Sequence, residues 1–274
     1  MTYVIAEIGI NHNGDIDLAE QLIDKAKQSG CDAVKFQKRT VDVVYSQDEL
    51  DTPRKSPFGT TTREQKEGIE LSIEEFKELE NYTKNLGLDF IVSCWDLDSV
   101  DDIENNVDVK YHKVASAMLT DKEFLEKLNA TGKPIIVSTG LSTEEEIDKA
   151  LNVLDNVEYV LACTSTYPTK AEEVNLKYIT TLKEKYPNLK IGFSNHYNGL
   201  DACVGSAALG AECVEFHITM DRAMYGSDQP ASSENVNDLV TGIRQMEQMV
   251  GDGVKKVYDT EKPIIEKLRK VNNV

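Results

Sequence analysis

Short apolar segments alternate with amphipathic segments along most of the chain. Eight apolar segments have the length and composition of buried strands, at residues 3–8, 33–37, 89–93, 111–115, 135–138, 159–162, 190–194 and 213–217. Each is followed by a helical pattern, which is typical of parallel strands joined by crossover helices. The pattern therefore predicts an α/β fold, a single TIM-type (β/α)₈ barrel. An open doubly wound sheet is disfavoured because it usually has fewer strands, and neither glycine-rich phosphate fingerprint is present.

Local signals place several helix ends. Ser72 with Glu75, and Ser142 with Glu145, have the spacing of N-terminal capping boxes. Three glycines follow predicted helix ends, where a left-handed C-cap suits glycine: Gly87, Gly132 and Gly210.

One connection, residues 38–71, is long for a compact domain. Such a segment is either a functional lid or a surface excursion without fixed structure. The barrel is expected to occupy residues 1–250, followed by a C-terminal helical tail at 251–274 with one helix at 261–271.

Composition narrows the possible partners. The 274 residues match the roughly 250 that such a barrel needs. The net charge of −18 disfavours nucleic acid and anionic membranes as partners. We see no apolar stretch of membrane-spanning length and no signal-peptide pattern. Five scattered cysteines without a C-x-x-C pair indicate a reducing compartment, so a cytoplasmic protein is expected.

Polar residues end or follow every predicted strand, which is where TIM barrels carry their active sites. His196 and His217 end the seventh and eighth strands. These strands are neighbours in a barrel, so the two imidazoles are predicted to share a divalent metal ion. The nearest candidate carboxylates to complete the coordination are Glu7 and Asp228.

The other two histidines are treated separately. A hydrogen-bonded core position is the alternative for any single histidine, and we favour it for His112. For His12 both interpretations stay open.

Lys35 and Lys113 lie in otherwise apolar strand segments, and buried lysines are rare unless they are paired. Three interpretations are open: a structural ion pair with Glu7, an anion site, or a Schiff-base lysine. Three serines at strand ends offer further donors to an anion: Ser116, Ser138 and Ser194. Two cations with several small donors suit a phosphorylated acid better than a neutral sugar.

These residues lie in longer strings, at residues 6–15, 33–37, 111–116, 133–140, 192–196, 215–222 and 226–228. In these strings the chain resembles the sialic acid synthase family, which includes legionaminate, pseudaminate and spore-coat polysaccharide synthases. The strings cover nearly the whole chain in the family's order. The first string and the two histidine strings are the most specific.

The resemblance implies a TIM barrel that condenses phosphoenolpyruvate with an open-chain aldose, commonly an N-acylmannosamine-type sugar. The products are a nonulosonic acid and phosphate. It implies Mn²⁺ or a similar ion such as Mg²⁺ or Co²⁺, and a homodimer or higher homo-oligomer. By resemblance, the metal ligands are His196 and His217, and the catalytic residues are Glu7, Lys35, Lys113 and Asp228. Phosphoenolpyruvate is expected at Lys35, Lys113, Ser116, Ser138 and Ser194, and the sugar at Gln37, Tyr167, Asn195 and Asp228.

The chain departs from the family pattern at two places, one where the sugar would bind and one where the phosphate would bind. The sequence stops where the linker to the family's antifreeze-like domain would begin, so that domain and its substrate-binding arginine are expected to be absent. Arg54, Lys55 or Arg63 of the long connection are candidates to cap the site instead. Residues 93–96 read Ser-Cys-Trp-Asp where the family often has Ser-Thr-Pro-Phe, which would remodel the phosphate end.

Other functions stay open at this stage. A related synthase would make an octulosonate or a deaminated nonulosonate from an unacetylated or phosphorylated aldose. A metal-dependent aldolase would use pyruvate and release no phosphate. A non-catalytic barrel would bind a sugar or a partner protein.

Overall fold

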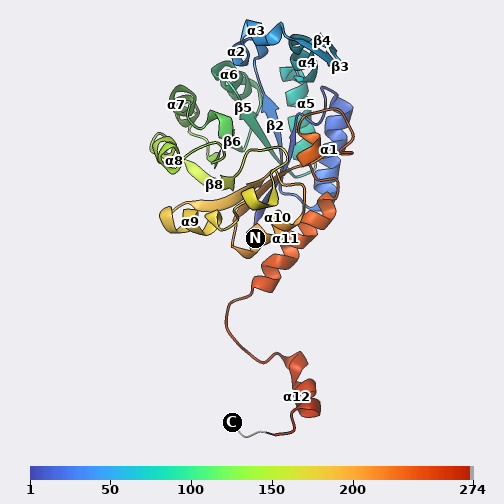
Figure 1. Ribbon diagram of the computed structural model, residues 1–274, viewed down its shortest axis with the longest axis vertical. Coiled ribbons are helices and arrows are strands. Elements are labelled where there is room, and N and C mark those ends of the chain that lie inside the picture. Colours follow the sequence, from blue (N-terminus) through green and yellow to red (C-terminus); the bar gives the residue numbers. More distant parts are fainter. Residues whose placement is uncertain (272–274) are drawn as a thin grey trace.

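Eight parallel strands close into a barrel in the computed structural model, which describes residues 1–271 (Figure 1). The strands are β1 (Tyr3–Gly9), β2 (Ala33–Lys38), β5 (Asp89–Cys94), β6 (Tyr111–Val114), β7 (Ile135–Ser138), β8 (Val157–Cys163), β9 (Lys190–Asn195) and β10 (Cys213–His217). Around the barrel they follow the order β1-β10-β9-β8-β7-β6-β5-β2, and β1 pairs with β2 to close it. All eight predicted strands are confirmed, each to within two residues at either end.

Helices surround the barrel (Figure 1). They are α1 (Ile16–Ser29), α5 (Ile73–Asn85), α6 (Leu97–Asn106), α7 (Lys122–Ala130), α8 (Glu144–Leu151), α9 (Tyr178–Lys185), α10 (Asp201–Ala208) and α11 (Val236–Val250). Their apolar faces pack on the outward-facing strand residues in one continuous core, where Phe36 contacts Phe76 and Phe90. The TIM-type prediction is therefore confirmed.

The barrel interior is divided into an apolar and a polar layer, because successive strand residues point to opposite faces. The lower layer is apolar and fully packed, with Tyr3, Ile5, Ile91, Tyr111, Ile136, Tyr159, Leu161 and Cys213. Two residues further along the strands, the inward-facing side chains are polar and form the second layer. On β1, Ile5 is followed by Glu7, and on β6, Tyr111 is followed by Lys113. The apolar layer thus forms the floor of a polar site.

Most helix caps occur at the residues predicted from the sequence. Ser72 and Glu75 form the predicted capping box of α5. The prediction for α8 is wrong by one residue: its capping box is Thr143 with Glu146, and Ser142 instead donates to the Gly140 carbonyl. The three glycines past helix ends have left-handed backbones as predicted: Gly87, Gly132 and Gly210.

The long connection after β2 is fully structured. It contains α2 (Val41–Val44), α3 (Gln47–Leu50), a hairpin of β3 (Pro53–Ser56) and β4 (Gly59–Thr61), and α4 (Thr62–Ile69). Phe58 of the hairpin turn packs edge-on against Tyr225 of the loop after β10, with ring centroids 6.1 Å apart. The connection therefore reaches the loops at the barrel mouth, and we call it the lid. A surface excursion without fixed structure is excluded.

Short 3₁₀ helices complete the description: η1 (Ser116–Met118), η2 (Ala171–Glu173), η3 (Gln229–Ala231) and η4 (Asp259–Glu261). After α11 the chain leaves the barrel and runs away from it to α12 (Lys262–Leu268), which is shorter than the helix predicted there (Figure 1). Residues 272–274 of the predicted tail lie outside the described residues. Within residues 1–271, no helix has both the length and the apolar character needed to cross a membrane.

The position of the α8 cap can be tested by a pair of substitutions. Thr143 accepts a hydrogen bond from the Glu146 backbone N–H, so Thr143→Ala is expected to cost about 1 kcal/mol of unfolding free energy. Ser142→Ala removes no cap and should change the unfolding free energy by at most a few tenths of a kcal/mol. Urea denaturation measures both. The reverse ranking would contradict the assigned cap.

Candidate active site

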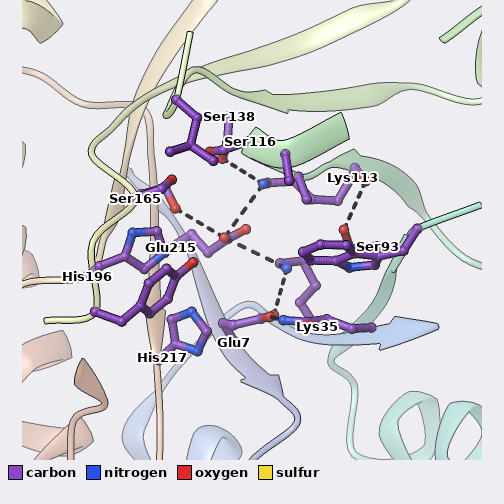
Figure 2. Close-up of a pocket in the computed structure, with 17 residues that line it drawn as sticks. Glu7, Lys35, Ser93, Lys113, Ser116, Ser138, Ser165, His196, Glu215 and His217 are labelled. Atoms are coloured by element: carbon purple, nitrogen blue, oxygen red, sulfur yellow. Dashed lines mark hydrogen bonds and ion pairs between the residues drawn. The ribbon is translucent and has the colours of Figure 1, made fainter. Parts of the chain in front are cut away.

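A cavity of about 140 Å³ opens at the carboxyl ends of the barrel strands, and we call it the inner cavity (Figure 2). Ten of the predicted site residues line it: Glu7, Lys35, Gln37, Lys113, Ser116, Ser138, Tyr167, Ser194, His196 and His217. They come from all parts of the sequence. The barrel brings them together because each lies at or near the carboxyl end of a strand or in the segment that follows it.

Strand register explains which side chains become neighbours. Glu7 of β1 lies opposite Lys35 of β2 on one side and His217 of β10 on the other. Ser194 of β9 lies opposite Glu215 of β10. In a parallel barrel, side chains that are in register and face inward share one layer. The polar layer is thus fixed by main-chain pairing and does not depend on flexible loops.

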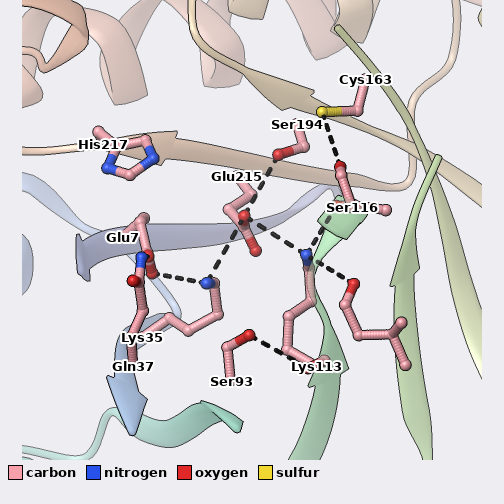
Figure 3. Close-up of polar contacts among 12 residues, drawn as sticks. Glu7, Lys35, Gln37, Ser93, Lys113, Ser116, Cys163, Ser194, Glu215 and His217 are labelled. Carbon is pink, nitrogen blue, oxygen red and sulfur yellow. Dashed lines mark hydrogen bonds and ion pairs between the residues drawn. The ribbon is translucent and has the colours of Figure 1, made fainter. Parts of the chain in front are cut away.

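Four buried charges form one network in this layer (Figure 3). Lys35 Nζ lies 2.7 Å from Glu7 Oε2 and 3.9 Å from Glu215 Oε1. Lys113 Nζ lies 3.7 Å from the same Glu215 oxygen. All four side chains are at most 6% exposed. One carboxylate therefore links two lysines that the chain contributes from β2 and β6.

Glu215 was missed as a site residue by sequence reasoning. It lies two residues before His217 on β10, and residues two apart on a strand face the same side. That spacing was a sufficient signal. The open question about Lys35 is also settled in part: the ion pair with Glu7 is present.

The two lysines differ in their electrostatic environment. Burial lowers the pKa of Lys35, but Glu215 and Glu7 outweigh this effect and hold the pKa above its usual value. Burial also lowers the pKa of Lys113, and there Glu215 offsets it only in part, so the pKa stays below its usual value. Lys113 Nζ donates to Ser138 Oγ at 2.6 Å. Lys113 is thus the more easily neutralised of the two cations.

Small polar side chains complete the inner cavity. Ser194 Oγ donates to Glu215 Oε1 at 3.2 Å, and Gln37 Nε2 donates to Glu7 Oε1 at 2.6 Å. Lining residues that were not assigned from the sequence include Ser93, Trp95 and Ser165.

His196 and His217 lie side by side with ring centroids 5.3 Å apart. His196 Nδ1 donates to the Thr164 carbonyl at 2.8 Å, which leaves Nε2 as the electron-pair donor. His217 Nδ1 is buried and has no hydrogen-bond partner among residues 1–271; Asp228 Oδ2 lies 3.8 Å away. A backbone-anchored imidazole beside an unpartnered one suits the predicted two-histidine metal site.

The two imidazoles are not part of a larger cluster of metal-ligating side chains among the described residues. In the described part of the chain, no group of three or more His, Cys, Asp and Glu side chains is arranged to hold a metal ion. Any ion at this pair would therefore take its remaining ligands from water or substrate.

A second cavity of about 250 Å³ adjoins the first, and we call it the outer cavity. Gln37, Trp95 and Tyr167 line both cavities, whereas Asp228 lines only the outer one. Residues of the lid that also line the outer cavity include Arg39, Tyr45, Lys66 and Glu70.

Two expectations about the sugar end need correction. Asn195 lines neither cavity: its side chain points out of the barrel interior, donates to the Tyr197 carbonyl at 2.8 Å and accepts from the Tyr197 N–H at 3.1 Å. The alternation along β9 turns Ser194 and His196 inward and the residue between them outward.

The three cations proposed to cap the site line neither cavity either. Arg54 and Lys55 are exposed on β3, and Arg63 pairs with Asp42 and Glu67. The lid instead presents Lys66 to the outer cavity.

The remaining histidines have structural partners. His112 is buried with Nε2 2.9 Å from Glu104 Oε1, which confirms the core position predicted for it. His12 is buried against Phe36, and its Nδ1 accepts from the Gly14 N–H at 3.0 Å. Burial lowers the pKa of His12 to about 4, so it is neutral at physiological pH. Neither residue lines the inner cavity.

Fold and site together define a class: a (β/α)₈ barrel with a buried polar cavity that two lysines line beside two histidines. Comparison with known proteins agrees with this class. The model of the NeuB family matches residues 22–255. An N,N'-diacetyllegionaminic acid synthase of Campylobacter jejuni is 37% identical, with 98% of this chain and 83% of that protein covered. The human N-acetylneuraminate-9-phosphate synthase is 34% identical, with 98% and 76% covered.

A solved structure agrees as well. The crystal structure of an N-acetylneuraminic acid synthetase from Leptospira borgpetersenii superposes with a TM-score of 0.84 at 27% identity, covering 98% of this chain and 93% of that one. The chain therefore belongs to the NeuB family, and the resemblance inferred from the sequence strings is confirmed.

Glu215 can be tested through the pH dependence of the site. Its negative charge raises the pKa of both lysines, so Glu215→Gln should lower both pKa values. The lysines then lose their charge at lower pH, and anion binding fails earlier on the alkaline side. We expect the alkaline limb of the kcat/KM profile to move down by roughly one pH unit.

The matched control is Glu212→Gln, because Glu212 is an exposed carboxylate just before the same strand. It should leave the profile unchanged. If Glu215→Gln and the unmodified protein have the same pH profile, Glu215 does not control the pKa of the two lysines.

Proposed function

We propose that the protein condenses phosphoenolpyruvate with an open-chain aldose to give a nonulosonic acid and phosphate. Membership in the NeuB family supports this reaction. The observation that carries the proposal is the inner cavity, where two buried lysines, several hydroxyls and two histidines surround one space. The outer cavity continues from it and offers room for the second substrate.

Phosphoenolpyruvate carries a carboxylate and a phosphate monoester, both anionic at neutral pH. Lys35 and Lys113 are the buried cations positioned to bind them, with hydroxyl donors from Ser116, Ser138 and Ser194. Because these donors sit on barrel strands or directly after them, they hold the enol carbon in a fixed position, which is a positioning contribution to catalysis.

The charge balance supports a metal ion at His196 and His217. Lys35 and Lys113 carry two positive charges, which Glu7 and Glu215 cancel. A substrate with two anionic groups therefore gains little net attraction from these four residues alone. We propose Mn²⁺, or Mg²⁺ or Co²⁺, as the missing positive charge. Such an ion, when bound, acts as a Lewis acid toward the aldehyde oxygen.

The reaction then proceeds by carbon–carbon bond formation. The enol C3 of phosphoenolpyruvate attacks the aldehyde carbon, and the aldehyde oxygen takes up a proton to become a hydroxyl. Positive charge develops at C2, where water adds and gives up a proton. The resulting tetrahedral carbon expels phosphate by breaking its C2–O bond, which leaves the keto group of the product.

Glu7 is our candidate for accepting the proton of the attacking water. It lines the inner cavity, where the phosphoenolpyruvate lies in this proposal, whereas Asp228 lines the outer cavity. Lys35 and Gln37 hold the Glu7 carboxylate in place. Asp228, Gln37 and Tyr167 face the aldose.

The proposal is tested by supplying phosphoenolpyruvate labelled with ¹⁸O in the C2–O bridge, Mn²⁺ and a panel of aldoses. Because the C2–O bond breaks, we expect phosphate release that depends on the aldose, with the label in phosphate. Mass spectrometry detects both the phosphate and the sugar acid. Turnover with pyruvate in place of phosphoenolpyruvate would favour an aldolase and contradict the proposal.

The metal site is tested without reference to activity. Equilibrium dialysis with Mn²⁺ should show about one bound ion per chain in the unmodified protein, because two imidazoles provide one divalent site. The His196→Ala/His217→Ala double variant should lose that ion. His112→Gln, which changes a buried histidine outside the cavity, should retain it. Equal binding by all three proteins would place the metal elsewhere.

A further inference from the structure

We propose that Arg39 is a positioning residue for the condensation: it fixes the side-chain amide of Gln37 so that the NH₂ group faces Glu7 and holds that carboxylate in place. The inference rests on the proposed function, because it adds a residue to the same reaction. It follows from a chain of buried polar contacts that runs from the lid to the inner cavity. Figure 3 shows its last link, with Gln37 beside Glu7.

Arg39 lies where the two cavities meet, because it contacts Gln37 and Trp95, which line both. Its guanidinium lies 4.3 Å from the centroid of the Trp95 ring, and its Nη2 donates to Gln37 Oε1. Glu70, at the end of α4, accepts from the Arg39 backbone N–H at 3.1 Å and from Nη1 at 3.4 Å. Arg39 is only 8% exposed. These protein contacts therefore set the orientation of its guanidinium.

The contacts of Gln37 leave one orientation for its amide group. Oε1 faces a guanidinium, which has only N–H donors, and Nε2 donates to Glu7 Oε1 at 2.6 Å. Rotating the amide by half a turn would place its NH₂ group against the donors of Arg39. The same rotation would place its carbonyl oxygen against the Glu7 carboxylate. Because both of these contacts are repulsive, Arg39 determines which end of Gln37 meets Glu7.

Glu7 has one fixed partner on each carboxylate oxygen. Gln37 binds Oε1, and Lys35 Nζ lies 2.7 Å from Oε2. The backbone of Gly9, with a φ of 57°, passes beside the Gln37–Glu7 hydrogen bond. A Cβ atom at Gly9 would lie 3.0 Å from Glu7 Oε1 and 3.1 Å from Gln37 Nε2, which is closer than ordinary van der Waals contact. The main chain thus packs closely against this hydrogen bond.

This arrangement serves the proton transfer assigned to Glu7. A general base must keep a lone pair directed at the proton that it accepts, and small displacements of a reacting group lower the rate. With Arg39 in place, Gln37 presents a donor to Glu7 in every molecule. Without a donor at Oε1, the amide is free to rotate and turns its carbonyl toward Glu7 in part of the population. The effect of Arg39 on the rate therefore passes through Gln37.

The orientation of Gln37 is tested without turnover by ¹H–¹⁵N correlation spectra of the side-chain amides. The Gln37 signal is identified as the one that is missing from Gln37→Met. In the unmodified protein we expect one of its two protons far downfield of the other, because that proton is donated to a carboxylate. Arg39→Met should move this proton upfield, since the amide no longer donates to Glu7 in every molecule. Arg39→Lys keeps a donor for Oε1 and should retain the downfield signal.

The role in the reaction is tested by a double-mutant cycle. Arg39→Met and Gln37→Met are each expected to lower kcat roughly tenfold, with KM for phosphoenolpyruvate unchanged. Because Arg39 acts through Gln37, the double variant should lose no more than Gln37→Met alone. Arg39→Lys should recover most of kcat. Arg63→Met removes another ion-paired arginine of the lid, which lines neither cavity, and should behave like the unmodified protein.

The outcomes separate the two proposals. The positioning role is overturned, while the proposed condensation stands, if the Gln37 amide signal is the same in Arg39→Met and the unmodified protein. Losses of kcat that multiply in the double variant overturn it equally. Absence of product from the unmodified protein with every acceptor contradicts the condensation, and the positioning role falls with it. A displaced amide signal together with losses that do not multiply supports both.

Discussion

The site depends on one buried interaction, the placement of the Glu215 carboxylate between Lys35 and Lys113. Two ammonium groups in one small interior space repel each other, and each pays a desolvation penalty. The shared carboxylate offsets both effects and keeps the lysines inside the barrel. Glu7 completes the arrangement from the neighbouring strand. The result is a cation pair held ready for an anion but electrically balanced in its absence.

The barrel makes this arrangement possible because it fixes side chains by main-chain register. Glu7, Lys35 and Glu215 come from three consecutive strands around the barrel, and none depends on a loop for its position. The apolar layer beneath them, from Tyr3 to Cys213, excludes water from one side and stiffens the floor. The lid and the loop after β10 border the outer cavity instead. The proposed function thus assigns anion binding and acceptor choice to different elements.

Much of this was predictable from the sequence. Their position at or near strand ends placed Lys35, Lys113, His196 and His217 at the barrel mouth. Period-two alternation along the strands, applied as well, would have added Glu215 and removed Asn195. The α8 cap was displaced by one residue because Ser142 and Thr143 both stand three residues before a glutamate. That Arg39 and Lys66 line the outer cavity was not predictable, since it depends on how the lid folds back over the barrel mouth.

We propose that the buried lysine pair binds phosphoenolpyruvate. Calorimetric titration of phosphoenolpyruvate, with Mn²⁺ present, into the unmodified protein and into Lys113→Met measures this directly. We expect a loss of affinity of roughly tenfold to a hundredfold, because a buried charge-assisted contact is removed. Lys122→Met, at an exposed lysine of α7, should bind normally. Unchanged affinity in Lys113→Met would show that the lysine pair does not bind phosphoenolpyruvate.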